Sequence, residues 1–310
     1  MIDSQYNTLI LKYFRYCENR KNLDSKTIKS YRIDLHQYAE FCQERQLDRY
    51  EKSTLEQYIE LLHRKFKPKS VKRKIASIKA FYHYLEFEDI IEINPFHKIQ
   101  LNYKESFILP KTIPISNIES ILRYAYMQLK LADTPYSKMT ALRNTLIIEL
   151  LFATGMRISE LCSLTFEQIN YSDYIIKING KGSRERLIQI CNKNVHTLMT
   201  EYREKYLKNA NEKDYYFINR LHNRLSDQSV RNMLSNYAKG ANVAQHITPH
   251  MFRHSFATLL LEEDVDIRYI QQMLGHSSIT TTQIYTHTST KKQKAILTTK
   301  HPRNAIKLDV

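Results

Sequence analysis

Residues 248–258 read TPHMFRHSFAT, and this stretch places two reactive side chains at the start of a helix. Thr248 is a suitable N-cap, and Pro249 suits the first helical position because the N–H that it lacks has no partner there. His250 and Arg253 lie three residues apart and therefore share one face of the first turns. We expect a helix that presents an imidazole and a guanidinium side by side.

The same stretch raises a metal-binding alternative, because His246, His250 and His254 are spaced four residues apart. We discount it for three reasons: Pro249 starts the helix after His246, the glutamate of an H-E-x-x-H motif is missing, and no cysteine is near. No metal site and no cofactor are expected.

A second stretch, ATGMRISEL at residues 153–161, combines a glycine turn with an arginine. Gly155 is expected to end a helix in a left-handed turn, so that Arg157 opens the next helix. An arginine opposes the helix dipole at that end, which is understandable if an anion binds there. A salt bridge from Arg157 to Glu160 is the alternative, and the residues alone leave both open.

A β-hairpin is expected from Tyr174–Ile178 and Arg186–Ile190, with Gly180-Lys181-Gly182 as its turn. The turn would project Lys181 beyond the sheet, either as an ordinary solvated lysine or as part of a site.

Near the C-terminus, Gly275 is expected to end a helix and to place His276 on a turn, before a short helix that ends at Tyr285. The chain has 22 tyrosines, so Tyr285 alone carries no signal.

Together these pieces resemble the tyrosine recombinase or phage integrase family. The phrases TGMRISEL, TPHMFRHSFAT and LGHSSITTTQIYTH are close to its Xer-like and integrase branches, over the C-terminal two-thirds of the chain. The N-terminal third resembles the core-DNA-binding helical domain of that family only loosely. The resemblance covers an ordered catalytic set without a departure from the family pattern: Arg157, Lys181, His250, Arg253, His276 and Tyr285.

The resemblance implies a site-specific DNA recombinase that cleaves and rejoins strands through a 3′-phosphotyrosine and a Holliday junction. Tyr285 would be the nucleophile, and two guanidiniums would neutralise the phosphate oxygens in the transition state. The phosphotyrosine keeps the energy of the broken ester, so no ATP is needed. The remaining implied roles are a base or orienting group for His250, a hydrogen-bond donor for His276, a general acid for Lys181 and a supporting carboxylate for Glu160.

The implied partners are double-stranded DNA with a specific recombination site and three further copies of the chain, as a homo-tetramer on two DNA sites. An accessory protein or a second recombinase is possible in this family. The C-terminal NAIKLDV could dock on a neighbouring subunit or be a frayed tail. An Xer-like resolution of DNA dimers is favoured. A mobile-element integrase, a DNA invertase, a topoisomerase and a DNA-binding protein without catalysis remain as alternatives.

The composition agrees with an anionic partner. The 310-residue chain carries 47 Lys and Arg against 32 Asp and Glu, a net charge of +15, which suits nucleic acid first and a membrane surface second. Four scattered cysteines and the absence of a signal-peptide pattern favour a cytoplasmic protein. The most apolar stretch, Leu146–Phe152, is too short to span a membrane and is expected in a core helix.

Only five glycines are present, which favours a mainly α fold. We expect a helical N-terminal core-DNA-binding domain at 1–93, a linker at 94–114, and an α+β catalytic domain with a small antiparallel sheet at 115–310. Helices are expected at 6–17, 26–45, 55–66, 71–86 (capped by Ser70), 116–131, 140–153, 195–206, 227–239, 249–262, 267–274, 280–285 and 291–297, and a strand at 215–218.

A basic run, RKFKPKSVKRK at residues 64–74, surrounds Pro68. It is either a solvated face or a set of phosphate contacts at the start of a helix. The candidate DNA-binding residues are Lys67, Lys69, Lys72, Arg73 and Lys74.

Overall fold

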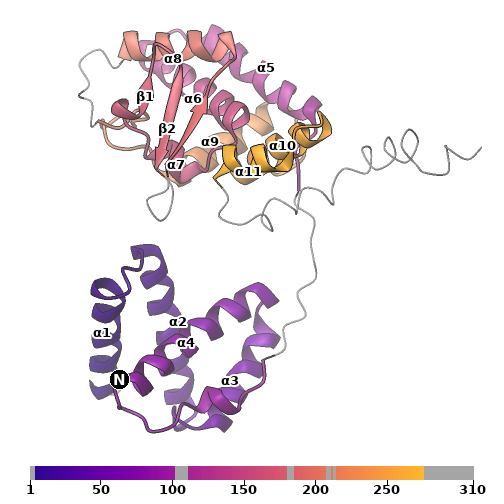
Figure 1. Ribbon diagram of the computed structural model, residues 1–310. Helices are drawn as coiled ribbons and strands as arrows, with labels where there is room; N and C mark the ends of the chain where they lie inside the picture. The colour runs from indigo at the N-terminus through magenta and orange to yellow at the C-terminus, as the bar shows by residue number, and fades with distance from the viewer. Residues whose placement is uncertain (1–3, 102–110, 180–184, 207–210, 212–213, 276–310) are drawn as a thin grey trace, which may run out of the picture. The chain divides into compact units, whose positions relative to one another are not determined.

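The computed structural model describes residues 4–101, 111–179, 185–206, 211 and 214–275. The chain divides into two compact units, Met1–Phe107 and Ile108–Val310, and each is described by itself (Figure 1). The fold is mainly helical with one small antiparallel sheet, which confirms the expected fold class. Among the described residues, no helix has the length and apolar character needed to cross a membrane.

The described part of the N-terminal unit, residues 4–101, contains four helices and a short 3-10 helix. They are α1 (Ser4–Asn19), α2 (Ser25–Glu44), α3 (Lys52–Lys65), α4 (Pro68–Phe87) and η1 (Pro95–Lys98). Asp24 caps α2 as expected, because its side chain accepts a hydrogen bond from the Thr27 N–H at 2.8 Å. Aromatic rings fill the core of this unit, where Tyr13, Tyr38, Phe81 and Tyr82 are fully buried.

The expected Ser70 cap of the fourth helix is wrong. The helix α4 already begins at Pro68, with Lys67 as its N-cap in an extended conformation. Proline is well suited to the first helical position, since its ring fixes a helical φ and its missing N–H would have no partner there. The proline therefore starts the helix instead of breaking the chain ahead of it.

A buried carboxylate ties α2 to α4. Asp34 is fully buried, and it accepts hydrogen bonds from Lys74 Nζ at 3.1 Å and from Ser77 Oγ at 2.8 Å. The guanidinium of Arg73 donates to the same carboxylate, and Lys74 also donates to Gln37. The charge of Asp34 is thus matched by two cations from the facing helix.

At the centre of the C-terminal unit lies α6 (Pro135–Thr154), which packs against four other helices. Leu146, Ile147, Leu150 and Leu151 are fully buried on it, which confirms that the apolar stretch belongs to a core helix. The other helices in the described residues of this unit are α5 (Ile115–Leu131), α7 (Ile158–Cys162), η2 (Phe166–Gln168), α8 (Lys193–Tyr206), α9 (Asp227–Gly240), α10 (Pro249–Glu262) and α11 (Ile267–Leu274). The helices expected at 280–285 and 291–297 lie outside the described residues.

The start of α6 was placed too late. The helix begins at Pro135 and not at Thr140, because Thr134 and Ser137 form a reciprocal cap. The Ser137 N–H donates to Thr134 Oγ1 at 3.1 Å, and the Thr134 N–H donates to Ser137 Oγ at 3.0 Å.

The sheet has three strands in the order β1 (Ile169–Asn170), β2 (Ile175–Asn179) and β3 (Glu185–Gln189), drawn as neighbouring arrows in Figure 1. The expected hairpin is confirmed, with Ile176 opposite Ile188 and Ile178 opposite Arg186. The strand β1 was not predicted, because it is only two residues long.

The expected strand at 215–218 is wrong. The segment makes only isolated bridges, from Thr165 to Tyr215 and from Ile218 to Arg224. Its central residues Tyr216 and Phe217 are fully buried. Their apolar, aromatic character therefore reflects packing in the core and not strand pairing.

We expect Asp34→Ala to destabilise the N-terminal unit by about 3–5 kcal/mol, because it leaves the buried ammonium of Lys74 without its counter-charge. Urea unfolding of the full chain would measure the loss, and amide hydrogen exchange in α2 and α4 would assign it to this unit. Glu40→Ala is the matched control, since Glu40 lies on α2 but is half-exposed and pairs only with His36. Equal effects of the two variants would contradict the role of Asp34.

Candidate active site

A glycine turn aims the first candidate arginine. Gly155 ends α6 with φ 59° and ψ 19°, as expected from the sequence. A Cβ atom at this position would lie 2.7 Å from Phe256 Cδ1 and 2.9 Å from Leu274 Cδ2. Both the backbone conformation and the close packing therefore require glycine. The chain reverses here, and Arg157 becomes the N-cap of α7.

Glu160 holds Arg157 in place from one helical turn further on. Its carboxylate accepts hydrogen bonds from the Arg157 backbone N–H at 2.7 Å and from Arg157 Nη1 at 2.8 Å. The salt bridge that the sequence left as an alternative is therefore present. It does not remove Arg157 from solvent, because the side chain is 36% exposed. The ion pair and an anion-binding role are compatible.

Arg186, on β3, was not among the candidates from the sequence. Its Nη1 and Nη2 donate to the two carboxylate oxygens of Glu160 at 3.0 Å and 2.7 Å, and its Nε donates to the Met273 carbonyl at 3.0 Å. The alternation of inward and outward residues in β3 is the sequence pattern that could have identified Arg186. An arginine at 186 stands on the same face as Ile188, where an unpaired charge would be costly.

His250 and Arg253 begin α10 as expected. Arg253 is only 4% exposed, and it donates to the Gly155 carbonyl at 2.8 Å and to the Leu274 carbonyl at 2.6 Å. Desolvation lowers the pKa of His250, and the nearby guanidiniums of Arg253, Arg231 and Arg157 lower it further. The imidazole is therefore held in its neutral form, which can accept a proton.

Three arginines converge on the C-terminal end of α11. Arg186 donates to the Met273 carbonyl at 3.0 Å, and Arg253 donates to the Leu274 carbonyl at 2.6 Å. Arg157 Nη2 reaches the Gly275 carbonyl at 3.4 Å. A helix C-terminus carries partial negative charge, so the guanidiniums suit this position. The site thus joins α7, β3 and α10 to the end of α11.

Gly275 ends α11 in a left-handed conformation with φ 65°, as expected. A Cβ atom there would lie 3.0 Å from both Cδ and Nη1 of Arg186, so the guanidinium packs against the bare backbone.

Three of the predicted site residues, Lys181, His276 and Tyr285, lie outside the described residues. The described residues bring together Arg157, Glu160, His250 and Arg253, and the roles of all seven residues in catalysis stay predictions.

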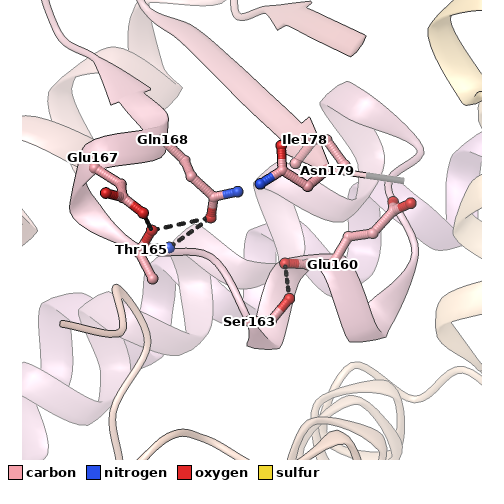
Figure 2. A pocket seen from close by; sticks show the side chains of 7 residues that line it. All are labelled: Glu160, Ser163, Thr165, Glu167, Gln168, Ile178 and Asn179. Carbon is pink, nitrogen blue, oxygen red and sulfur yellow. Dashed lines mark hydrogen bonds between the residues drawn. The ribbon is translucent and has the colours of Figure 1, made fainter. Parts of the chain in front are cut away.

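A small polar pocket adjoins Glu160 (Figure 2). Its lining includes two acidic residues, Glu160 and Glu167, and no basic one, so we do not assign the phosphodiester to it. Gln168 closes one side, where its Oε1 accepts from the Thr165 N–H at 2.9 Å. The lining residues are Glu160, Ser163, Thr165, Glu167, Gln168, Ile178 and Asn179.

The basic run in the N-terminal unit divides into two kinds of side chain. Lys67, Lys69, Lys72 and Arg73 are exposed at the start of α4. Lys74 differs from them because it is buried, and both its ammonium and the exposed guanidinium of Arg73 pair with Asp34. Within the described parts of both units, no group of three His, Cys, Asp or Glu side chains could hold a metal ion.

Burial of His254 makes the stability of the C-terminal unit dependent on pH. Desolvation, with smaller effects of His250 and Arg253, lowers the pKa of His254 from 6.5 to about 4. Between these two values the unfolded chain binds the proton and the folded chain does not. Stability is therefore lost as the pH falls from 6.5 towards 4.

We expect the urea midpoint to fall between about pH 7 and about pH 5, and to fall less in His254→Gln than in the wild type. His83→Gln is the control, because His83 is 71% exposed. A wild-type pH dependence that survives unchanged in His254→Gln would rule out this assignment.

Comparison with known families gives two matches. The model of the phage integrase family matches residues 125–292, and the model of the phage integrase N-terminal SAM-like domain matches residues 10–89. A protein of Agathobacter rectalis called tyrosine recombinase is 53% identical over 296 residues, with 96% of this chain and 97% of that protein covered. Tyrosine recombinase XerD of Halalkalibacterium halodurans is 33% identical over 305 residues, with 96% and 98% covered.

Solved structures show the same fold. The post-cleavage complex of the XerH site-specific recombinase with palindromic difH substrate has a TM-score of 0.74 at 21% identity, over 94% of this chain and 84% of that chain. The crystal structure of XerA recombinase has a TM-score of 0.53 at 25% identity, over 96% and 99%. From these matches, the chain belongs to the phage integrase family and is a tyrosine recombinase of the Xer-like kind.

Proposed function

We propose that this recombinase cleaves and rejoins DNA at a specific site through a covalent bond between Tyr285 and a 3′-phosphate. The observation that supports this is the convergence of Arg157 and Arg253 on the end of α11, directly before His276 in the chain. Two guanidiniums at one point provide forked donors for the oxygens of a single phosphodiester.

The proposed chemistry divides the work among the candidate residues. Arg157 and Arg253 neutralise charge on the non-bridging oxygens, with His276 as a further donor. His250, held neutral, takes or orients the proton of the Tyr285 phenol. Lys181 protonates the leaving 5′ oxygen. Because Arg253 is only 4% exposed, its contact with phosphate requires a shift of the carbonyl of Leu274.

The biological role proposed is Xer-like resolution of DNA dimers. Relatives named XerD and XerC align with nearly the whole chain, with 96% of this chain covered in each case. Exchange between two duplexes requires four strand cuts, so we propose a homo-tetramer on two double-stranded DNA sites through a Holliday junction. We place this assembly in the cytoplasm, with an accessory protein or second recombinase as a further partner.

DNA contacts of the N-terminal unit are proposed at the start of α4. Lys67, Lys69, Lys72 and Arg73 are exposed there, beside the positive end of the helix dipole. For Lys74 we propose a supporting role, since its pairing with Asp34 fixes the segment that carries the other cations.

We expect wild-type protein, incubated with a nicked suicide duplex, to form a covalent protein–DNA adduct, and Tyr285→Phe to form none, because the phenol oxygen is the proposed attacking atom. Denaturing gel electrophoresis detects the adduct. A chelator is expected to leave the yield unchanged. Adduct formation by Tyr285→Phe would show that another residue is the nucleophile, and binding without any wild-type adduct would favour a non-catalytic DNA-binding protein.

We expect Lys67→Gln, Lys69→Gln and Lys72→Gln each to reduce the salt dependence of DNA binding. The slope of log affinity against log salt is negative, and each lost phosphate contact should reduce its magnitude by about 0.9. Fluorescence anisotropy at several salt concentrations measures the slope. Lys52→Gln is the control, because Lys52 pairs with Glu56 on α3. If the three variants and the control share the wild-type slope, α4 does not contact phosphate.

A further inference from the structure

We propose that Arg186 is a positioning residue for DNA cleavage, which sets the guanidinium of Arg157 relative to the end of α11. This inference rests on the proposed function. Within the described residues, Arg186 donates to Glu160 and to the backbone of α11, and we infer that it acts through these two contacts.

The first contact is a two-pronged ion pair with Glu160. Both side chains are only 9% exposed, and the two bonds measure 3.0 Å and 2.7 Å. The same two oxygens of Glu160 also accept hydrogen bonds from Arg157, one from its backbone N–H and one from its Nη1. The position of the Glu160 carboxylate therefore determines the position of Arg157, and Arg186 fixes that carboxylate through both of its oxygens.

The electrostatics of Glu160 agree with this arrangement. Burial by itself would raise the pKa of Glu160, but hydrogen bonds from Arg186 and Arg157 outweigh burial and lower the pKa. Arg186 thus helps to keep Glu160 ionised in a buried place. A neutral Glu160 would bind the guanidinium of Arg157 more weakly.

The second contact reaches α11. Arg186 Nε donates to the Met273 carbonyl at 3.0 Å, and its side chain fills the space where Gly275 has no Cβ. Arg157 Nη2 contacts the Gly275 carbonyl at the same helix end. Arg186 therefore connects Glu160 of α7 to the C-terminal end of α11, and His276 follows directly in the chain.

A lysine could not replace these contacts. The ammonium would keep the charge, but it lacks the planar fork that meets both Glu160 oxygens while a third nitrogen donates to Met273. We expect Arg186→Gln to slow cleavage about 100-fold, the scale of loss when a catalytic group is misplaced by about 1 Å. Arg186→Lys should be intermediate. DNA affinity should be unchanged, because Arg186 is buried.

The test is single-turnover cleavage with saturating protein. The substrate is a nicked suicide duplex whose site has been selected from random-sequence DNA by the wild-type protein. Arg203→Gln is the matched control, since Arg203 is an exposed arginine on α8 that lies over the ring of Tyr171. It should cleave at the wild-type rate.

A second substrate separates positioning of Arg157 from general damage. A methylphosphonate at the scissile position replaces one charged oxygen by a methyl group, so less negative charge has to be neutralised by arginine. If Arg186 acts through Arg157, the ratio of wild-type to Arg186→Gln rates should shrink at least tenfold on this substrate. Arg157→Ala should show the same shrinkage. Misfolding would slow both substrates equally.

The outcomes separate the two claims. If the wild type forms no adduct with its selected site, the proposed function is wrong and the inference falls with it. If the wild type cleaves its site, and both Arg186→Gln and Arg186→Lys cleave it as fast as the wild type, only the role of Arg186 is wrong. Equal slowing on both substrates would also overturn it. For a poorly folded Arg186→Gln, the Arg186→Lys rates on the two substrates decide in the same way.

Discussion

The buried carboxylate of Glu160 is the constraint on which the described part of the active site depends. It accepts two hydrogen bonds from Arg157 and two from Arg186, so α7 and β3 meet at a single side chain. A carboxylate that is only 9% exposed is stable as an ion only with such partners. The same two arginines then contact α11, which places the end of that helix relative to the rest of the unit.

Local sequence signals predicted the parts of the structure that are fixed locally. The bounds of α10 and α11 followed from Pro249 and Gly275, and the turn before Arg157 followed from Gly155. These helix ends and turns depend on a residue and its near neighbours, which is the information that a single sequence contains. The candidate set, in contrast, came from the resemblance of the ordered motifs to the tyrosine recombinase family.

Long-range pairing left much weaker signals. Arg186 and Glu160 are 26 residues apart, and Lys74 and Asp34 are 40 apart, so no spacing rule connects them. Lys74 looked like the last member of a basic surface run, but a facing helix supplies its buried partner. The strand predicted at 215–218 is wrong for the same reason, because Tyr216 and Phe217 are buried in a core formed with residues far away in the sequence.

The arginines at the end of α11 donate hydrogen bonds to backbone carbonyls of the protein itself. Arg253 gives one N–H to Gly155 and one to Leu274, and a phosphate oxygen that takes either N–H displaces a carbonyl. The carbonyl at the end of α11 and a phosphate oxygen would therefore compete for the same N–H donors of Arg253. If Arg253 binds phosphate as proposed, the two equilibria are linked: detachment of the end of α11 raises the affinity for phosphate by the same factor by which bound phosphate favours detachment.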